Sequence, residues 1–473
     1  MRKFIKNVSY LMFVNVLSFV ISAVITFVVP KFLSIREYSY FQLYLFYLNY
    51  LGFCCIGWID GIVLRYAGKY YEDIDKKVFS GQFKLYSFLE ILIGIIVIVV
   101  VAIIKPDDVD KMQVFVMIGV AIILSQVNAF FRYLMQVVNY INVYAQNMLL
   151  EKIVYILGVA LVLGSKNYNY KYLIWADLLA KLVVLVHMLI VNRELVKTKS
   201  VPLQGTLIEA KENISVGLKL LAANGSSLLI VGIIRYTIQS HWDVETFGKI
   251  SLSLSVSNMF MVFVQAVGVS LFPMLRRIRK ELLSKLYLII RHTLMFSMLG
   301  MLILYYPAYR ILSLWLPQYA ESLHYMALMF PICIFESKIQ LLIEPYLKSL
   351  RKEKDLLKIN LSAVGLSLFS SALTIVILNN LNLAVLSIVI ILGYRCVALE
   401  LIIERTIKIQ LKKDIAGEIL MVISFIVFNW CLGGPLGVLA YALVYVVYVI
   451  INRSGIIETI GFVKKGINSE LLD

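Results

Sequence analysis

Charged side chains inside otherwise apolar stretches are the residues of this chain whose types and positions could do chemistry. The cations among them are Arg65, Lys181, Arg235, Lys338 and Arg395. A charge at the centre of a bilayer costs about 2.5–3.5 kcal/mol on insertion scales, so such residues usually face protein or water. Cations at several depths favour a cavity for an anionic substrate, because arginine binds a diphosphate bidentately and lysine binds it as a point charge.

The five cations are expected at graded depths. Arg65 is placed near the inner surface, Lys338 and Arg395 near the middle, and Lys181 and Arg235 further out. The alternative interpretation of Arg65 is a side chain that snorkels to the interface and takes no part in a cavity.

Three carboxylates in apolar stretches, Asp60, Asp177 and Glu336, are candidates for binding a coupling ion. A buried carboxylate can take up and release a proton when its surroundings change. Asp177 precedes Lys181 by four residues on one helical face, so the alternative is that these two charges simply neutralise each other.

Glu336 begins a polar stripe that continues with Gln340 and Glu344 on one helical face. Pro331 and Pro345 flank the stripe and predict a bent helix. Bent helices with charges often line transport pathways, because freed backbone carbonyls need a polar environment. The stripe is therefore expected to face a cavity.

A second acidic pair, Glu400 and Glu404, lies one turn apart near the end of an apolar stretch. We interpret these two carboxylates as meeting Arg405 and Lys408 in interfacial water.

Arrangements for catalysis and cofactor binding are missing from the sequence. It has no P-loop, and its five cysteines lack metal-ligand spacing. The four histidines have no acid or nucleophile nearby in sequence: His187, His241, His292 and His324. We expect no metal, no cofactor and no enzymatic activity. A membrane polymerase or acyltransferase is the alternative from another class, and short outer loops argue against it.

Composition indicates a membrane protein of many spans. Of the 473 residues, 61% are hydrophobic and 16% charged, against about 25% charged in soluble domains. The formal net charge is +16, but its placement indicates membrane topology and no nucleic-acid partner. The first apolar stretch lacks a cleavage site and is expected to remain as a span.

Fourteen apolar stretches are long enough to span a bilayer, and we expect an all-α polytopic protein. If the N-terminus is cytoplasmic, 33 of the 45 basic residues fall in inner segments, 9 in outer loops and 3 within spans. This asymmetry predicts that both termini are cytoplasmic. The predicted spans are 8–29, 40–64, 84–104, 112–135, 147–165, 170–191, 214–238, 250–272, 286–305, 323–346, 359–378, 382–402, 416–432 and 435–452.

Two similar segments predict an internal repeat. Asn7-x-Ser9 introduces the first span and Asn213-x-Ser215 introduces the seventh. Two six-helix lobes in the same orientation would be related by a pseudo-two-fold axis along the membrane normal. The predicted domains are 1–200, 201–410 and 411–473, the last holding spans thirteen and fourteen and a cytoplasmic tail.

The end of the second span resembles a known family. Gly61-x-x-x-Arg65-Tyr66 resembles the second-helix end of bacterial polysaccharide flippases, which belong to the multidrug/oligosaccharidyl-lipid/polysaccharide (MOP) exporter superfamily. The exit of the first span, Val29-Pro30-Lys31-Phe32-Leu33, and the following Glu37-Tyr38 are also similar to that family. The resemblance covers about residues 1–80.

The resemblance implies a MATE-like fold and a flippase for an undecaprenyl-diphosphate-linked oligosaccharide. The flippase would move this oligosaccharide, which is the repeat unit of a surface polysaccharide, across the bacterial plasma membrane by alternating access, for surface polysaccharide biosynthesis. A proton or sodium ion would be the coupling ion, polymerase and glycosyltransferase would be partners, and the chain would be a monomer. The family's first and seventh helices face a central cleft, which makes Asn15 and Asn224 candidates to bind substrate; interhelical hydrogen bonding is the alternative.

Two alternatives within the superfamily stay open. A peptidoglycan lipid-precursor flippase would also have fourteen helices. A multidrug/cation antiporter typically has twelve helices and an acidic or apolar cavity, so the two extra helices and the cations argue against it.

Overall fold

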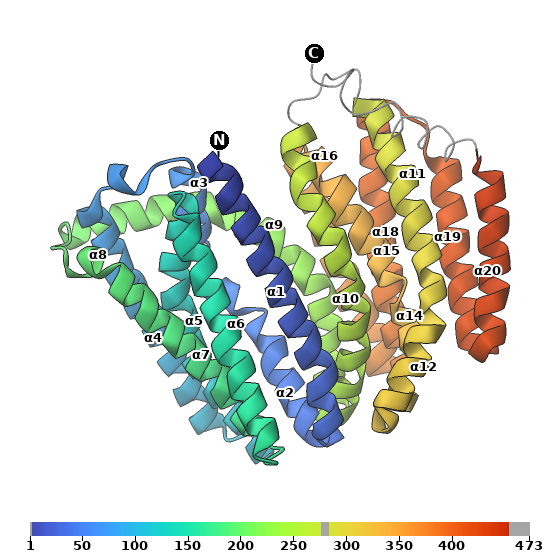
Figure 1. Cartoon of the computed structure of the whole chain (residues 1–473), viewed down its shortest axis with the longest axis horizontal. Helices are drawn as coiled ribbons and strands as arrows, with labels where there is room; N and C mark the ends of the chain where they lie inside the picture. The colour runs from blue at the N-terminus through green and yellow to red at the C-terminus, as the bar shows by residue number, and fades with distance from the viewer. Residues whose placement is uncertain (1, 276–282, 454–473) are drawn as a thin grey trace. The chain divides into compact units, whose positions relative to one another are not determined.

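The computed structural model describes residues 2–275 and 283–453, with side chains left undescribed at 2–9, 11–12, 260 and 262–275. All regular elements in this part of the chain are helical (Figure 1). Twelve of these helices are long and apolar enough to cross a membrane, and the number rises to 13 if one bent pair counts as a single span. The expectation of an all-α membrane protein with many spans is confirmed.

The chain forms two compact units, Met1–Gly225 and Ser226–Asp473, which divide within one helix, α9 (Leu203–His241). The domain boundaries predicted at 200/201 and 410/411 stay predictions.

The first unit is built from long helices and two short ones. In unit 1, α4 packs along α5 and α6 along α7. Aromatic side chains fill the core between α4 and α5, with Phe83 and Phe131 in direct ring contact. The helices are α1 (Arg2–Phe32), α2 (Ile35–Leu48), α3 (Trp58–Tyr66), α4 (Lys76–Ile104), α5 (Val109–Val137), α6 (Ile141–Gly164), α7 (Tyr170–Val191), α8 (Arg193–Lys197) and the first part of α9.

Side-chain caps explain where these helices begin. Asp75 accepts hydrogen bonds from backbone amides at the start of α4, and Asn169 does so for α7. Asp108 caps α5 in the same way. Burial acts to raise the pKa of Asp108, but hydrogen bonds from Tyr40 and from the first amides of α5 outweigh it and hold that pKa below its ordinary value.

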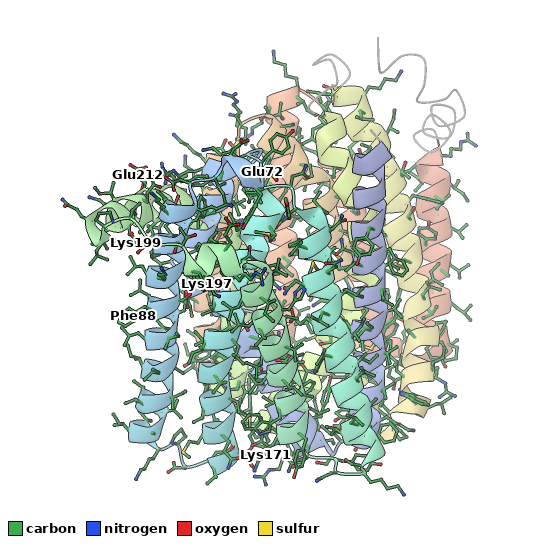
Figure 2. All side chains as sticks on the ribbon, turned by 60° about the vertical axis from the view of Figure 1, so that its left-hand side comes forward. Glu72, Phe88, Lys171, Lys197, Lys199 and Glu212 are labelled. Carbon is green, nitrogen blue, oxygen red and sulfur yellow. The ribbon has the colours of Figure 1, made fainter. Side chains whose placement is uncertain are left out.

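Several charged residues of unit 1 lie near the ends of its helices. Figure 2 shows Lys197, Lys199 and Glu212 near one end and Lys171 at the other, while Phe88 points outward from the middle of α4. This separation of charged ends from an apolar belt is what a bilayer requires of a helical bundle.

The second predicted span, 40–64, is broken in the structure, whereas the sequence suggested one continuous helix. α2 ends at Leu48, and α3 begins at Trp58 after a bend of 55°. Ile56 and Gly57 have φ of 48° and 77° at the break, in the left-handed region that a continuing helix excludes.

Close backbone packing accounts for the glycines after the break. A Cβ at Gly61 would lie 1.9 Å from the backbone oxygen of Asn213 on α9, and a Cβ at Gly217 would lie 1.9 Å from that of Gly57. The α3 and α9 backbones are therefore in direct contact, as small residues allow between membrane helices.

The second unit contains three π-helical segments among its helices. Its order is the rest of α9, α10 (Val244–Leu275), α11 (Leu283–Met301), α12 (Tyr305–Trp315), α13 (Ala320–Leu323), α14 (Met326–Met329), α15 (Ile332–Lys338), α16 (Glu344–Ser349), α17 (Glu353–Ser371), α18 (Leu381–Ile407), α19 (Lys412–Val427) and α20 (Gly434–Ile451). The π segments are η6 (Ile339–Ile343), η7 (Ala372–Ile377) and η8 (Phe428–Leu432).

The helix that carries the Glu336 stripe is irregular, as the flanking prolines suggested. A turn at Phe330 and Pro331 precedes α15, and η6 separates α15 from α16. π segments often occur at functional sites, because the extra residue redirects the side chains around it.

We predict that Gly61→Ala lowers the thermal unfolding temperature of the purified protein. The added methyl has to push α3 away from the α9 backbone, and such overpacking costs about 1–3 kcal/mol. Gly365→Ala is the matched control, because a Cβ there meets no atom within 4 Å and alanine favours the helix. Equal unfolding temperatures for the two variants would contradict the close contact.

Candidate transport site

An ion pair lies at the middle of α7, between Asp177 and Lys181. Tyr44 on α2 donates a second hydrogen bond to Asp177, at 2.6 Å. The predicted pairing is confirmed. Lys181 lies about 16 Å along the helix from either end of α7, and its predicted depth in the membrane stays a prediction.

Lys181 also lines a polar cavity of about 290 Å³ in unit 1. Arg132 on α5 is a second cation in its wall and lies 3.6 Å from the carboxylate of Glu151 on α6. The rest of the wall combines amide and hydroxyl side chains with apolar residues. These lining residues are Leu48, Leu51, Gly52, Leu124, Ser125, Gln126, Asn128, Ala129 and Tyr133. The cavity thus combines cations with hydrogen-bonding groups, which suits a phosphorylated or sugar-containing solute.

Arg65 at the end of α3 is held by the first turns of α9. Its guanidinium donates to Glu209 at 2.9 Å, to Glu212 at 2.6 Å and to Asn213 at 2.7 Å. Asp60 on the same helix is half-buried and takes no part in this cluster. Arg65 therefore ties α3 to α9 near the glycine contact.

In unit 2, Arg395 on α18 is buried and fully engaged. It donates to Glu336 at 3.1 Å and Glu344 at 3.2 Å, and to Asn360 and Ser227 at 2.8 Å each. The predicted stripe from Glu336 to Glu344 thus faces a cation, and the two carboxylates on either side of η6 share one guanidinium.

A second buried cluster joins Lys338 and Arg291 to two carboxylates. Lys338 contacts Glu400, and it contacts Glu418 at 2.6 Å. Arg291 lies 2.6 Å from Glu400 and 2.8 Å from Glu418. This cluster connects α11, α15, α18 and α19.

The interfacial interpretation of the acidic pair is wrong for Glu400. Its side chain is 0% exposed and binds two cations from other helices, not Arg405 or Lys408. The error came from measuring depth along the sequence, since helix packing can bury a residue close to a helix end.

The remaining predicted residues lie apart from these clusters. Arg235 donates to Ser251 at 2.8 Å and stacks over the Phe247 ring. Asn15 on α1 and Asn224 on α9 are exposed. Their assignment to a substrate site stays a prediction.

Every predicted cation therefore has a partner: four have carboxylates, and Arg235 has a hydroxyl. The sequence did not identify most of the residues that pair with these cations. Arg291 and Glu418 lie inside the predicted spans 286–305 and 416–432, so a charged residue within an apolar stretch would have indicated both of them. Within the described residues, no group of histidines, cysteines and carboxylates could hold a metal ion.

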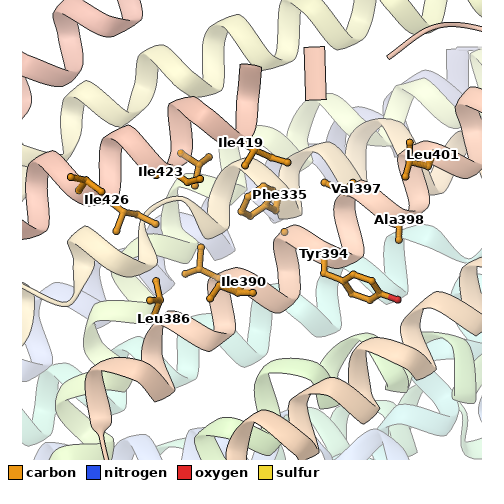
Figure 3. A pocket seen from close by; sticks show the side chains of 14 residues that line it. Phe335, Leu386, Ile390, Tyr394, Val397, Ala398, Leu401, Ile419, Ile423 and Ile426 are labelled. Atoms are coloured by element: carbon orange, nitrogen blue, oxygen red, sulfur yellow. The ribbon is translucent and has the colours of Figure 1, made fainter. Parts of the chain in front are cut away.

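An apolar groove of about 740 Å³ lies on unit 2 between α18 and α19 (Figure 3). Figure 3 shows Ile390 of α18 on one side and Ile419 and Ile423 of α19 on the other, with Phe335 between them. Gly393 widens the groove because it leaves room beside the Phe335 ring. Such a wall offers dispersion contacts and no hydrogen bonds, which suits an acyl or isoprenoid chain.

The fold and these clusters define an all-helical, multi-spanning membrane protein with polar groups buried inside its bundles. No family model and no curated protein matches the sequence. Among solved structures, the chain is similar to the lipid II flippase MurJ in an inward closed conformation, with a TM-score of 0.62 and 13% identity over 96% of this chain and 100% of that one. At this identity the match shows that the fold is shared.

A second solved structure is a MOP superfamily transporter from Pyrococcus furiosus, described as having a binding pocket of reverse polarity. Its TM-score is 0.48 at 10% identity, over 85% of this chain and 96% of that one.

We predict that Glu400→Gln destabilises the protein strongly. The change leaves Arg291 and Lys338 buried with less negative charge, and breaking a buried ion cluster in this way costs about 3–5 kcal/mol. Thermal unfolding in detergent measures the loss. The control is Glu353→Gln, at an exposed carboxylate in the first turn of α17; an equal shift in both variants would show that the Glu400 cluster adds no stability.

Proposed function

We propose that the chain is a flippase that moves an undecaprenyl-diphosphate-linked oligosaccharide across the bacterial plasma membrane for surface polysaccharide biosynthesis. The observation that carries the proposal is the polar cavity, where Lys181 stands at the middle of a membrane helix beside Arg132. A soluble headgroup needs such a cavity, because a diphosphate left in lipid would lose its hydration without compensation.

The headgroup binds by taking the place of the carboxylates that are paired with the two cations of the polar cavity. Lys181 is paired with Asp177 and Arg132 with Glu151, so neither cation is uncompensated before the substrate arrives. The diphosphate oxygens take over these contacts, with Arg132 able to bind two of them at once. Sugar hydroxyls pair with Gln126 and Asn128, which line the same cavity. Lys338, Arg395 and Arg235 are proposed to serve later stages of the path.

The lipid tail stays outside the polar cavity. The apolar groove between α18 and α19 supports this part of the proposal, because its wall from Ile390 to Ile423 matches a chain with no hydrogen-bonding groups. The proposed movement is alternating access, in which the headgroup crosses while the tail remains in an apolar environment.

The number of membrane crossings, the division into lobes and the side on which the termini lie belong to the same proposal. Counting α10 and the bent pair α2–α3 with the twelve candidate spans gives fourteen crossings. Two six-helix lobes and a C-terminal pair would then follow, with both termini cytoplasmic. The protein would act as a monomer, with a proton or sodium ion as the coupling ion, Asp60, Asp177 and Glu336 as candidate binding groups, and polymerase and glycosyltransferase as partners.

A peptidoglycan-precursor flippase is the second candidate function. The fold match with a TM-score of 0.62 to a lipid II flippase favours it. Both substrates would present a diphosphate between sugars and a polyprenyl chain, so the proposed chemistry of the cavity is the same. The two candidates differ in which pathway stops when the chain is removed.

We predict that a strain lacking this chain accumulates the lipid-linked oligosaccharide on the cytoplasmic side, and that wild type restores surface polysaccharide. Lys181→Met lowers the restored level about 10- to 100-fold at equal membrane abundance, because a charge-assisted contact contributes about 1.5–3 kcal/mol. The double variant Lys181→Met/Asp177→Asn shows the same loss without leaving a buried charge.

Lys171→Met is the matched control, at a partly exposed position near the start of α7. Oligosaccharide that reaches the outer face without the chain contradicts the flippase proposal. A block in cell-wall synthesis in place of surface polysaccharide would select the second candidate.

A further inference from the structure

A basic surface lies where α4 begins, on the segment that connects α8 to α9. The backbone oxygen of Thr198, the residue after α8, accepts hydrogen bonds from Ser80 at 2.8 Å and from Lys84 at 3.0 Å, both on α4. The backbone amide of Val201 donates to the backbone oxygen of Lys77 at 3.4 Å. These contacts hold the connecting segment against the first turns of α4.

The first turns of α9 cross α4 at this end. Thr206 lies against Gly81, where a Cβ would meet the Thr206 Oγ1 atom at 2.5 Å, and Asn213 donates to Gln82. Seven residues of α9, or about 10 Å of helix, thus meet two positions of α4 that are about 1.5 Å apart along its axis. This part of α9 therefore runs across α4 and not along it (Figure 1).

The crossing lies at the level of a membrane surface. Beyond Lys84, α4 continues for about twenty residues to Ile104 with Glu90 as its only charged side chain. An apolar stretch of that length fills the hydrocarbon core of a bilayer. Gly81 lies about 4.5 Å before Lys84 along the axis of α4, so the first turns of α9 lie beside the lipid headgroups.

Apolar side chains of these turns face away from the bundle. Leu203, Leu207 and Ile208 are 65%, 50% and 55% exposed. Thr206 and Ala210, on the side toward α4, are buried. An exposed apolar face on a helix at the headgroup level is typical of an interfacial helix, which buries such side chains at the boundary between headgroups and acyl chains.

The basic side chains around this face have no carboxylate partner among the described residues. Glu194 is bound by Lys76, and Glu209 and Glu212 are bound by Arg65, so the three carboxylates of α8 and the first turns of α9 are already compensated. The cations that remain are all exposed, and they are Lys77, Lys84, Arg193, Lys197, Lys199 and Lys211.

A hollow of about 600 Å³ opens beside α8. Arg193, Glu194, Lys197 and Thr198 line it, and Lys76 lies 2.7 Å from the Glu194 carboxylate. Arginine and lysine both donate to phosphate oxygens. The hollow therefore offers two cations to one phosphate group.

We propose that this basic platform binds an anionic phospholipid of the membrane in which the chain lies. The lipid phosphate lies beside Arg193 and Lys197, while Leu207 and Ile208 enter the layer below the headgroups. The platform consists of the six exposed cations, Lys77, Lys84, Arg193, Lys197, Lys199 and Lys211, with Leu203, Leu207 and Ile208.

Charge and apolar exposure together select this partner. A zwitterionic headgroup brings no net negative charge to the cations, and a soluble anion leaves Leu203, Leu207 and Ile208 in water. An anionic phospholipid satisfies both parts of the platform. The proposal is independent of the proposed transport function, because it rests on contacts at the surface of unit 1.

Photo-crosslinking in vesicles locates the lipid. The full chain is reconstituted in phosphatidylcholine with a small fraction of phosphatidylglycerol that carries a photoreactive headgroup. Adducts are mapped by mass spectrometry after digestion with a protease that does not cut at lysine. We expect adducts within residues 193–211. Adducts confined to other parts of the chain overturn the proposal, as does equal labelling of 193–211 by a photoreactive phosphatidylcholine.

Lys197→Gln/Lys199→Gln is expected to lower the labelling about 25-fold, because each lysine near an anionic membrane surface contributes about fivefold. Both side chains are exposed, so the fold is retained. The matched control is Lys105→Gln/Lys166→Gln, which removes two exposed lysines just beyond the far ends of α4 and α6 and leaves the labelling unchanged. Wild-type labelling of Lys197→Gln/Lys199→Gln, or an equal loss in the control, contradicts the proposal.

Two further arms separate a lipid from a soluble anion. Leu207→Ser/Ile208→Ser is expected to lower the labelling although every lysine remains, and unchanged labelling overturns the apolar part of the platform. Inorganic phosphate in excess, at constant ionic strength, is expected to leave the labelling unchanged. Suppression of the labelling by inorganic phosphate shows a site for a soluble anion and overturns the assignment to a lipid.

Discussion

Compensation of charge inside a membrane is the constraint on which the rest of this structure depends. A buried charge needs a partner, because neither lipid nor an apolar core can replace its hydration. Lys181, Lys338 and Arg395 each meet this need with carboxylates from the same or neighbouring helices. The helix bends, the π segments and the close glycine contacts set the course of the backbone on which these cations and carboxylates are carried.

Paired cations also suit a carrier better than free ones. A substrate must bind well enough to enter and weakly enough to leave, and an uncompensated cation in an apolar bundle would hold a diphosphate too tightly. In the proposed mechanism, Asp177 or Glu151 replaces the departing headgroup, so that Lys181 and Arg132 are paired in both states. The difference in free energy between the loaded and empty cavity then remains small, which is what repeated transport requires.

Much of the fold follows from the sequence, because hydrophobic length and basic loops are local signals. They identified the helices of the bundle and the Asp177–Lys181 pair, which lies within one helix. They did not show the break at Gly57, since a left-handed residue there depends on contact with α9, 160 residues later. The partners Arg132, Glu151 and Glu418 were missed for the same reason, because only packing between helices brings them to the cations.

Exchange of partners at Lys181 is the central claim, and binding of a short-chain polyprenyl diphosphate to the purified protein tests it most directly. Asp177→Asn removes the competing carboxylate while Lys181 stays in place. The account predicts that this variant binds the diphosphate about tenfold more tightly than wild type, equivalent to about 1.4 kcal/mol, and that Lys181→Met binds it more weakly. An affinity of Asp177→Asn equal to or below that of wild type would contradict the account.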